Sequence, residues 1–460
     1  MKRLRALLAC CLLTAAAVMA DGCSDAAEER TLVVLGPWTD GEERPFKAAL
    51  RRIGERTGRS YVYKGTRSLR ETLVAQLQAG APPDLAILSS PGELAEYARA
   101  GDAHPLPQRV AGAAVPPWAP FLTVENEQGQ ARTHAYWAPV RVDLKSLVFS
   151  RAKSTRKQPD WCLGVGSGAT SGWPGTDWVE DLLLQRQGPD AYERWATGKT
   201  PWQQTREAWK EWAALLAAND GNLAREGLSM SFEQLDNGRY GLLNGGHCTH
   251  EHQGSFIRRH YGDDVQPTST AAFFGAGKTG GQPDAKSDAQ SDGQSDGERD
   301  GERDGQSDGQ SEAQSQDNAF EVSGDMAAVF KPSAAAWDLL DRLTSRQARE
   351  DWAKAARPGE RPYFPGGAFG TVPLSQNTRA VQGLFDGASQ ICLDASDAMP
   401  PTLRDAFYRA VLEFLGDPQD AGLLDRLLKQ LEAERILQVQ ERAFVLDDLC
   451  ENVPGPSGSR

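Results

Sequence analysis

The chain has 460 residues, of which 40% are hydrophobic and 25% charged, and its formal net charge at pH 7 is −13. A chain of this length is long enough for two domains, each with a hydrophobic core of its own. Nucleic-acid phosphates and anionic membrane surfaces repel such a negative chain, so neither is expected as a binding partner.

The first residues have the pattern of an export signal. Basic residues at positions 2, 3 and 5 precede an apolar run over residues 6–20, which is too short to span a bilayer as a helix. We expect a signal peptide over residues 1–23 that ends in a bacterial lipobox, with Cys23 lipidated and the protein held on the outer face of the cell membrane. Ala20 and Asp21 depart from the usual lipobox, so cleavage after Ala20, giving a secreted or periplasmic protein, is the alternative.

Strands and helices alternate in the segment that follows. The apolar run at 29–38 predicts a buried strand, and residues 46–58 form the pattern of an amphipathic helix that Gly58 ends. Further along we expect a strand at 59–65, a helix at 69–80, a strand at 82–90 and a helix at 91–101. This alternation is typical of βαβ units and predicts an α/β fold with a parallel sheet covered by helices on both faces. Ligands bind beyond the carboxyl ends of the strands in such sheets.

Several segments, in a fixed order, resemble one protein family. They are GPWTDGEERPF, PPDLAILSSPGELAEYARAG, AYWAPVRVDLKSLVFS, WCLGVGSGATSGWPGTDWVEDLLL, CTHEHQGSF, SGDMAAVFKPS and DAMPPTLRDAFYRAVLEFL. From about Thr31 to Leu437 the chain resembles the extracellular solute-binding proteins of bacterial ATP-binding-cassette importers, in the carbohydrate-binding group that includes the maltose-binding proteins.

The resemblance implies a periplasmic-binding-protein-like fold of two α/β lobes, each a mostly parallel sheet flanked by helices, with the ligand in the cleft between them. Lobe one would comprise residues 31–139 and 319–375, and lobe two residues 140–275 and 376–450, with the first crossover at Pro139 to Arg141. The implied function is to capture a carbohydrate, an oligosaccharide or a glucoside, and to deliver it to the membrane permease. The protein would act as a monomer, without a cofactor and without catalysis.

Residues 276–318 interrupt the resemblance with an acidic insertion. The segment holds eleven acidic and four basic residues, repeats S-D-G-Q, and has no aromatic or large aliphatic side chain. Such a composition cannot offset the entropy lost on ordering, so we expect disorder. Calcium-binding repeats are the alternative, but they need bulky residues and a longer period.

The stretch GGHCTHEHQGSF raises the question of a metal site, because imidazole and thiolate are the ligands that zinc prefers. The sequence has no H-E-x-x-H motif and no second histidine cluster to complete such a site. Four cysteines follow Cys23, an even number that favours disulfides in an exported protein. Within the lobes implied by the resemblance, we expect the pairs Cys162–Cys248 and Cys392–Cys450, and a cleft-lining or structural role for His247, His250 and His252.

Sugars present apolar C–H faces and hydroxyl edges, so their sites combine aromatic rings with carboxylate, amide and guanidinium groups. Trp38 and Trp173 are expected on loops of opposite lobes, where they would hold the sugar between them; for every tryptophan, core packing is the alternative. Core positions are expected for Trp195, Trp209, Trp212 and Trp352, which have helical spacing. The residues that the strand ends and the resemblance place at the ligand are Trp38, Asp40, Glu42, Glu43, Ser89, Ser90, Arg141, Trp173, Asp177, Trp178, His252 and Gln253.

A secreted glycoside hydrolase and a metal-binding receptor are the alternative functions. A hydrolase needs two carboxylates across one glycosidic bond. Candidates by residue type are Glu42, Asp177, Glu180 and Glu251, but their spacing singles out no pair. The order of the resembling segments and the export signal favour a binding protein.

Overall fold

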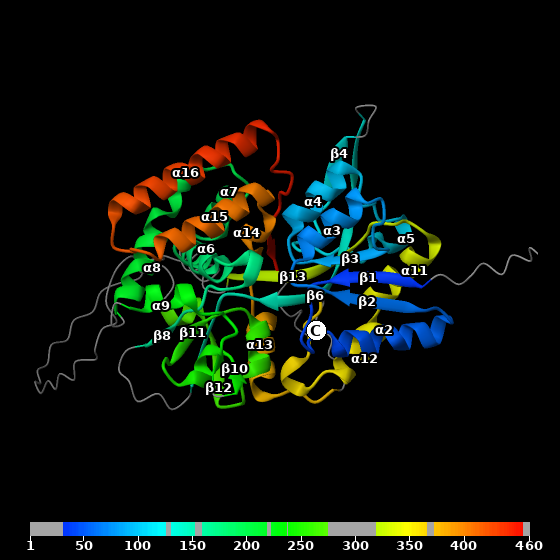
Figure 1. Cartoon of the computed structure of the whole chain (residues 1–460), viewed down its shortest axis with the longest axis horizontal. Helices are drawn as coiled ribbons and strands as arrows, with labels where there is room; N and C mark the ends of the chain where they lie inside the picture. Colours follow the sequence, from blue (N-terminus) through cyan, green and yellow to red (C-terminus); the bar gives the residue numbers. More distant parts are fainter. Residues whose placement is uncertain are drawn as a thin grey trace, which may run out of the picture.

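The computed structural model describes residues 31–125, 130–151, 159–218, 222–236, 238–274, 319–365 and 372–453. The expected signal peptide, its Cys23 and the acidic insertion at 276–318 lie outside these residues and stay predictions. Figure 1 shows two lobes side by side, with strands β6 and β13 running from one to the other. None of the helices in the described ranges is both long and apolar enough to cross a membrane.

Lobe one, the half built on β1–β3, contains the elements that the sequence predicted. Strand β1 (Leu32–Gly36) pairs in parallel with β2 (Tyr61–Gly65) and with β3 (Leu85–Leu88). The intervening helices are α2 (Arg44–Thr57), α3 (Leu69–Gln78) and α4 (Pro91–Ala100). Helix α2 ends where expected because Gly58 takes a left-handed conformation, with φ of 70°.

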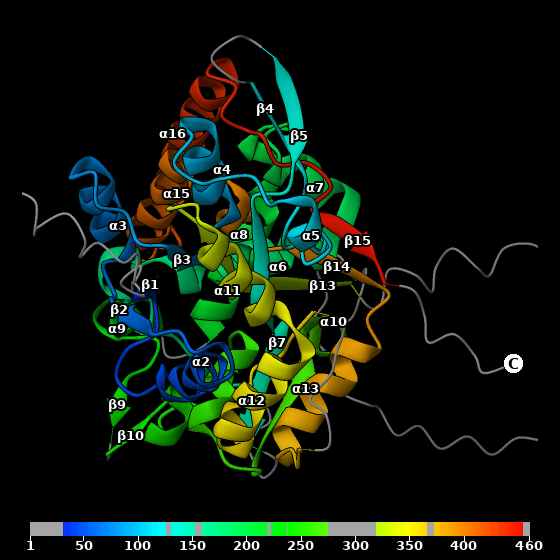
Figure 2. The same ribbon diagram turned by 90° about the vertical axis from the view of Figure 1, so that its right-hand side faces the viewer.

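Helices from a distant part of the sequence cover one face of this sheet. Helix α12 (Arg346–Ala355) packs against α2, and Figures 1 and 2 show the two side by side. Asp351 of α12 forms ion pairs with Arg52 and Arg56 of α2, at 2.9 and 2.7 Å. Lobe one is completed by α5 (Gln108–Ala111), α11 (Ala334–Thr344) and the hairpin of β4 (Leu122–Glu125) and β5 (Ala131–His134).

Lobe two, the half built on the second sheet, has the strand order β12-β7-β11-β8. Its strands are β7 (Leu147–Arg151), β8 (Trp161–Cys162), β11 (His250–His252) and β12 (Val265–Ser269). Its longer helices are α6 (Trp173–Gln187), α8 (Arg206–Ala218), α13 (Gln376–Asp386), α15 (Pro401–Phe414) and α16 (Ala421–Gln440). Figure 2 shows α15 and α16 packed along each other. Shorter elements are α7 (Pro189–Ala196), α9 (Leu223–Ser229), α10 (Thr270–Phe274), α14 (Ala395–Ala398) and the pair β9 (Leu235–Asp236) and β10 (Arg239–Tyr240).

Two long antiparallel strands join the lobes. Strand β6 (Trp137–Leu144) pairs with β13 (Ala319–Val329) from Leu144 opposite Val322 to Trp137 opposite Ala328. Residues 319–322 of β13 pair with β14 (Gln390–Leu393), whereas residues 326–329 pair with β3 of lobe one. The pairing of β13 therefore changes from β14 to β3 within its own length, between Val322 and Met326.

Both predicted disulfides are present. Cys162 bonds to Cys248, which ties β8 to the segment before β11, and Cys392 of β14 bonds to Cys450 of β15 (Cys450–Asn452). The four tryptophans expected in the core are buried: Trp195, Trp209, Trp212 and Trp352 have exposed fractions of 1%, 0%, 0% and 7%.

Candidate functional site

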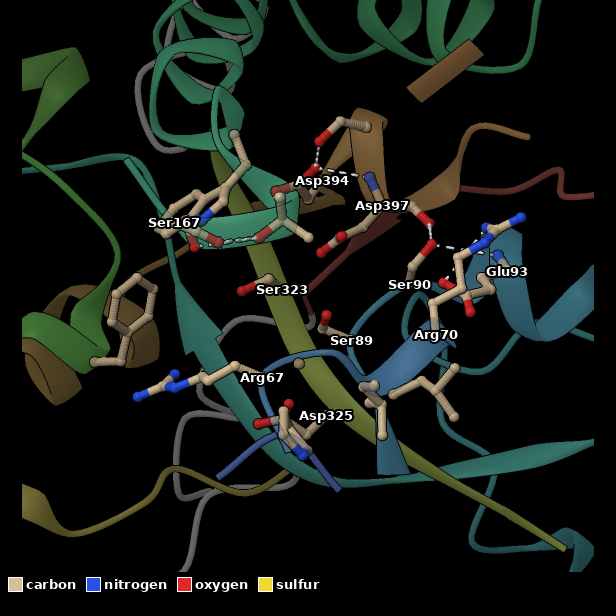
Figure 3. A pocket seen from close by; sticks show the side chains of 18 of the residues that line it. Arg67, Arg70, Ser89, Ser90, Glu93, Ser167, Ser323, Asp325, Asp394 and Asp397 are labelled. Carbon is tan, nitrogen blue, oxygen red and sulfur yellow. Dashed lines mark hydrogen bonds and ion pairs between the residues drawn. The ribbon is translucent and has the colours of Figure 1, made fainter. Parts of the chain in front are cut away.

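A pocket of about 320 Å³ lies between the lobes. Lobe one contributes the segments after its strands, including Glu42, Arg67, Ser89 and Ser90, and the joining strands contribute Arg141 and Asp325. Lobe two contributes side chains from α6, α14 and the loops around them. Figure 3 shows Arg67 and Ser89 on one side of the pocket and Asp394 and Asp397 across from them.

Three half-buried aromatic rings form the wall of the pocket in lobe two. Trp173 begins α6, and its ring lies edge-on to Phe232 at 4.9 Å and to Phe256 at 5.9 Å between centroids. Gly172, which precedes α6, has φ of 110° and approaches the carbonyl of Tyr408 so closely that a Cβ would lie 2.5 Å from it. Glycine is therefore required there, and it lets the Pro/Gly-rich loop turn Trp173 toward the pocket.

Arg141 of β6 organises the charges between the lobes. Its Nε lies 2.7 Å from Asp325 of β13 and its Nη1 lies 2.9 Å from Glu42 of lobe one. Burial raises the pKa of Glu42, but the cations of Arg259 and Arg141 outweigh burial, so the pKa falls below its usual value. Burial would lower the pKa of Arg141, yet Asp325 and Glu42 raise it overall. Arg141 and Glu42 are therefore both charged at neutral pH.

Lys145 organises the charges on the side of lobe two. Its ammonium lies 2.7 Å from carboxylate oxygens of both Asp177 and Asp394, and 5.0 Å from the ring centroid of Trp173. Burial would lower the pKa of Lys145, but the two carboxylates raise it well above its usual value. The lysine is fixed as a cation against the aromatic wall.

Several contacts cross from one lobe to the other at the rim of the pocket. Glu42 pairs with Arg259 of lobe two, and Glu93 of α4 lies 3.3 Å from Arg404 of α15. The hydroxyl of Ser90 donates to the main-chain carbonyl of Asp397 at 2.8 Å. The pocket is thus enclosed by charged and polar contacts between the lobes.

The structure brings part of the predicted site together. Glu42 and Arg141 form the ion pairs just described, Ser89 is exposed toward the pocket, and Ser90 also caps α4 by accepting from the amide of Glu93. The predicted residues that line the pocket are Trp38, Glu42, Ser89, Ser90, Arg141, Trp173 and Asp177.

Trp38 lies in the loop between β1 and α2, as expected, but its ring is buried. Its side chain is 2% exposed and packs against Phe46, Tyr63 and Trp352, at centroid distances of 4.9, 5.8 and 5.1 Å. Trp38 borders the pocket as part of the lobe-one core, with Arg141 over its ring at 5.1 Å. The short loop between β1 and α2 turns the ring inward, so a loop position in the sequence did not mean that the side chain is exposed.

Five other predicted residues do not line the pocket. Trp178 and His252 are buried against each other, at 4.5 Å between centroids, inside lobe two. Gln253 is buried and accepts from the amide of Gly254, while Glu43 accepts from the amide of Gly41 in the turn before α2. Asp40 is exposed and accepts a hydrogen bond from the hydroxyl of Thr39.

The histidine stretch has structural contacts. Cys248 is committed to its disulfide, His250 bonds to the hydroxyl of Thr249 at 2.8 Å, and His252 bonds to Asp181 at 2.8 Å. Cys248, His250 and His252 therefore each have a different partner and do not converge on one point.

Sequence reasoning missed much of the polar lining. Asp397, Arg404 and Phe256 lie inside segments that carry the family resemblance, so the signal was present but did not single them out. Asp325 also lies in such a segment, whereas Asp394 and Phe232 lie outside all of them and meet the pocket only through long-range contacts of the chain, which no local pattern reveals. The residues missed are Arg67, Arg70, Glu93, Asp143, Lys145, Phe232, Phe256, Arg259, Asp325, Asp394, Asp397, Arg404 and Tyr408.

Comparison with known protein sequences matches this chain to bacterial binding proteins. Residues 60–238 match the family model of bacterial extracellular solute-binding proteins. The chain is 26% identical over 428 residues to the alpha-glucosides-binding periplasmic protein AglE of Rhizobium meliloti strain 1021, covering 86% of this chain and 85% of that one.

Solved structures have the same fold. The bacterial solute receptor AcbH superposes with a TM-score of 0.62 at 12% identity, over 88% of this chain and 98% of the receptor. A chitin oligosaccharide binding protein superposes with a TM-score of 0.60 at 16% identity, over 89% and 100% of the two chains. These matches bear out the resemblance found in the sequence: residues 60–238 match the solute-binding family, and the chain has a two-lobed, periplasmic-binding-protein-like fold with a pocket between its lobes.

Proposed function

We propose that this protein is the substrate-binding component of an ATP-binding-cassette importer, and that it captures a carbohydrate in the pocket between its lobes. The observation that carries the proposal is the pairing of an aromatic wall, Trp173 with Phe232 and Phe256, with charged groups on the opposite side. Aromatic faces match the C–H faces of a sugar ring, and carboxylate, serine and guanidinium groups match its hydroxyls.

The names of the matched proteins support the same ligand class. AglE is named for alpha-glucosides and a fold neighbour for chitin oligosaccharides. A glucoside or a short oligosaccharide therefore heads the list of ligands to test. The sugar would be passed to the permease, and the chain would act as a monomer outside the cell, anchored through lipidated Cys23 or released after cleavage at Ala20.

The lobes would close on the sugar by rotation about the strands that join them. We place the first boundary at Pro139 to Arg141 of β6 and the second between Val322 and Met326 of β13, where its pairing changes from β14 to β3. Residues 319–322 then belong with lobe two. Hinges of this kind are formed by a few positions that absorb the backbone rotation.

A glycoside hydrolase is the weaker candidate. Of the four carboxylates considered for it, Glu180 and Glu251 are buried outside the pocket lining, while Glu42 and Asp177 are held in ion pairs by Arg141 and Lys145. Burial raises the pKa of Asp177 to about 6, but Glu42, the other of these four carboxylates that lines the pocket, is paired with Arg141 and is not the free nucleophile or base that glycoside hydrolysis needs.

A thermal-shift survey over glucosides and oligosaccharides tests the proposal, because a ligand that binds only the folded state raises the melting midpoint. Each sugar that raises the midpoint is then incubated with the protein, and reducing ends are measured. Binding without release of reducing ends supports the receptor. Release of reducing ends, or a midpoint that no sugar moves, contradicts it.

A further inference from the structure

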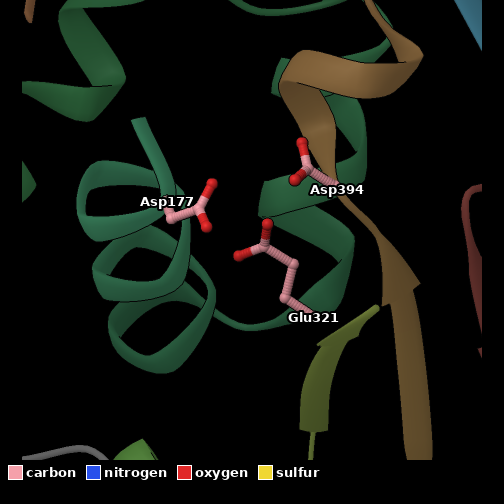
Figure 4. Close-up of side chains that lie close together, drawn as sticks. All are labelled: Asp177, Glu321 and Asp394. Carbon is pink, nitrogen blue, oxygen red and sulfur yellow. The ribbon is translucent and has the colours of Figure 1, made fainter. Parts of the chain in front are cut away.

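A group of buried carboxylates lies behind the pocket, in lobe two. Asp177 comes from α6, Glu321 from β13 and Asp394 from the turn before α14, and Figure 4 shows the three side chains pointing toward one another. One oxygen of each lies within 4.8 Å of the others. Glu180 and Asp397 add two further carboxylates whose charges act on the same group.

Lys145 balances only part of this negative charge. Its ammonium takes one oxygen of Asp177 and one of Asp394, each at 2.7 Å. Glu321 lies outside ion-pair distance of Lys145 among the contacts of the described residues, although it is 0% exposed. One lysine therefore faces five acidic side chains.

The oxygens that remain point to a missing partner. Within the described residues, both carboxylate oxygens of Glu321, Oδ1 of Asp177 and Oε1 of Glu180 are buried and have no hydrogen-bond partner. Burying a carboxylate without hydrogen bonds or a counterion costs roughly several kcal/mol of folding free energy. Either a proton or a cation must therefore neutralise these oxygens in the folded protein.

We propose that Asp177, Glu321 and Asp394 bind one divalent cation, and that the cation is Ca²⁺. Carboxylates are hard oxygen ligands, and three oxygens at this separation leave room for Ca²⁺–O distances of about 2.3–2.6 Å. Mg²⁺ demands a near-ideal octahedron and keeps several waters, and Zn²⁺ prefers nitrogen and sulfur. Asp177 can serve Lys145 through Oδ2 and the cation through its free Oδ1.

The cation would join three segments that are far apart in the sequence. It would fix the N-terminal part of α6, the lobe-two half of β13 and the start of α14; α6 and α14 also carry Trp173 and Asp397 of the pocket. Because the unfolded chain does not hold these carboxylates together, Ca²⁺ binds the folded state and raises its stability.

The test uses the full mature protein, stripped with EDTA and dialysed into metal-free buffer without sugar. Addition of CaCl₂ is expected to raise the melting midpoint by several degrees, and calorimetric titration to give one Ca²⁺ per chain. Glu321→Gln keeps the shape of the side chain but removes its charge, and is expected to weaken Ca²⁺ binding at least tenfold and to abolish the rise in midpoint.

Glu251→Gln is the matched control, because Glu251 is a buried carboxyl of lobe two that bonds to Tyr261 outside the group. It is expected to keep the full response to Ca²⁺. If Ca²⁺ neither binds nor stabilises the parent, while Glu321→Gln melts higher than the parent, Glu321 holds a proton and the proposal is wrong. A response to Mg²⁺ larger than that to Ca²⁺ overturns the choice of ion. Sugar binding is measured separately, so either proposal can fail alone.

Discussion

Trp38 and Trp173 both border the pocket, but their side chains have different surroundings. Trp38 is enclosed by Phe46, Tyr63 and Trp352 in the core of lobe one. Trp173 is half-buried at the start of α6 and has one face toward the pocket, beside Lys145. The same residue type therefore packs in the core at one position and is proposed to contact the ligand at the other.

Trp38→Ala should lower the free energy of unfolding by about 3–5 kcal/mol, because it leaves a cavity among three aromatic rings. Trp38→Phe fills most of that space and should cost less than the alanine variant. Urea unfolding of the three proteins checks the order. Unchanged stability of Trp38→Ala would mean that the ring is exposed in solution.

Trp173→Ala should weaken sugar binding by roughly 1–3 kcal/mol, the usual cost of removing a well-packed aromatic anchor. Trp337→Ala is the matched control, since Trp337 of α11 is also half-buried but does not line the pocket. Calorimetric titration with the sugar found in the thermal-shift survey compares the two. Equal affinities would remove Trp173 from the site.

Glu251 is the buried acid whose protonation can be followed most simply. Burial raises its pKa to about 8, although the hydrogen bond donated by the phenol of Tyr261 lowers it in part. An unfolded glutamate releases its proton near pH 4.3, about its unperturbed pKa. Between these two pH values the native state binds more protons than the unfolded state, so Glu251 makes the protein less stable as pH rises.

Glu251→Gln is neutral at every pH and still accepts a hydrogen bond from Tyr261. Its stability relative to the parent should therefore increase from pH 5 to pH 8 and stay constant above that range. Glu207→Gln, a change on the exposed face of α8, should follow the parent throughout. Melting curves across the pH series provide the test, and parallel profiles for parent and Glu251→Gln would show an ordinary pKa.

At the scale of elements, the sequence predicts those strands and helices that are determined by local patterns of apolar and polar residues. Strands β1–β3 and helices α2–α4 follow from alternating apolar runs and amphipathic helices, and Gly58 and Gly101 end two of the helices in left-handed conformations. The disulfides follow from an even cysteine count together with the lobe assignment.

Contacts between distant elements set the limit of sequence prediction. Arg141 meets Asp325 because β6 and β13 are neighbours, and Lys145 meets Asp394 because β13 also pairs with β14. No spacing along the chain encodes these contacts. The orientation of a ring next to a strand end is equally invisible, as Trp38 illustrates.

The bond between Cys392 and Cys450 ties the last described strand, β15, to β14. The cysteines are 58 residues apart, and removing a crosslink over that separation is expected to cost up to about 4 kcal/mol by chain entropy. The double variant Cys392→Ala/Cys450→Ala should unfold at lower urea concentration and still bind sugar, since neither cysteine lines the pocket. A transition that does not move would show that the bond constrains little.

At the scale of the whole molecule, the lobes touch through ion pairs on both sides of the pocket. Glu42 with Arg259 and Glu93 with Arg404 connect groups that must separate for a ligand to enter. A sugar that stacks on Trp173 and bonds to lobe one favours the closed arrangement by its higher affinity for it. If the pocket holds a sugar as proposed, closure depends on the sugar and on these pairs together.

Isothermal calorimetric titration of the metal-equilibrated protein with glucosides and short oligosaccharides tests the central claim most directly. At least one sugar is expected to bind with a stoichiometry of one per chain and a negative heat-capacity change, because apolar sugar faces are buried against the aromatic wall. Heat that stays at the dilution level for every sugar, with a protein that still unfolds cooperatively, would contradict the assignment of this pocket to carbohydrate.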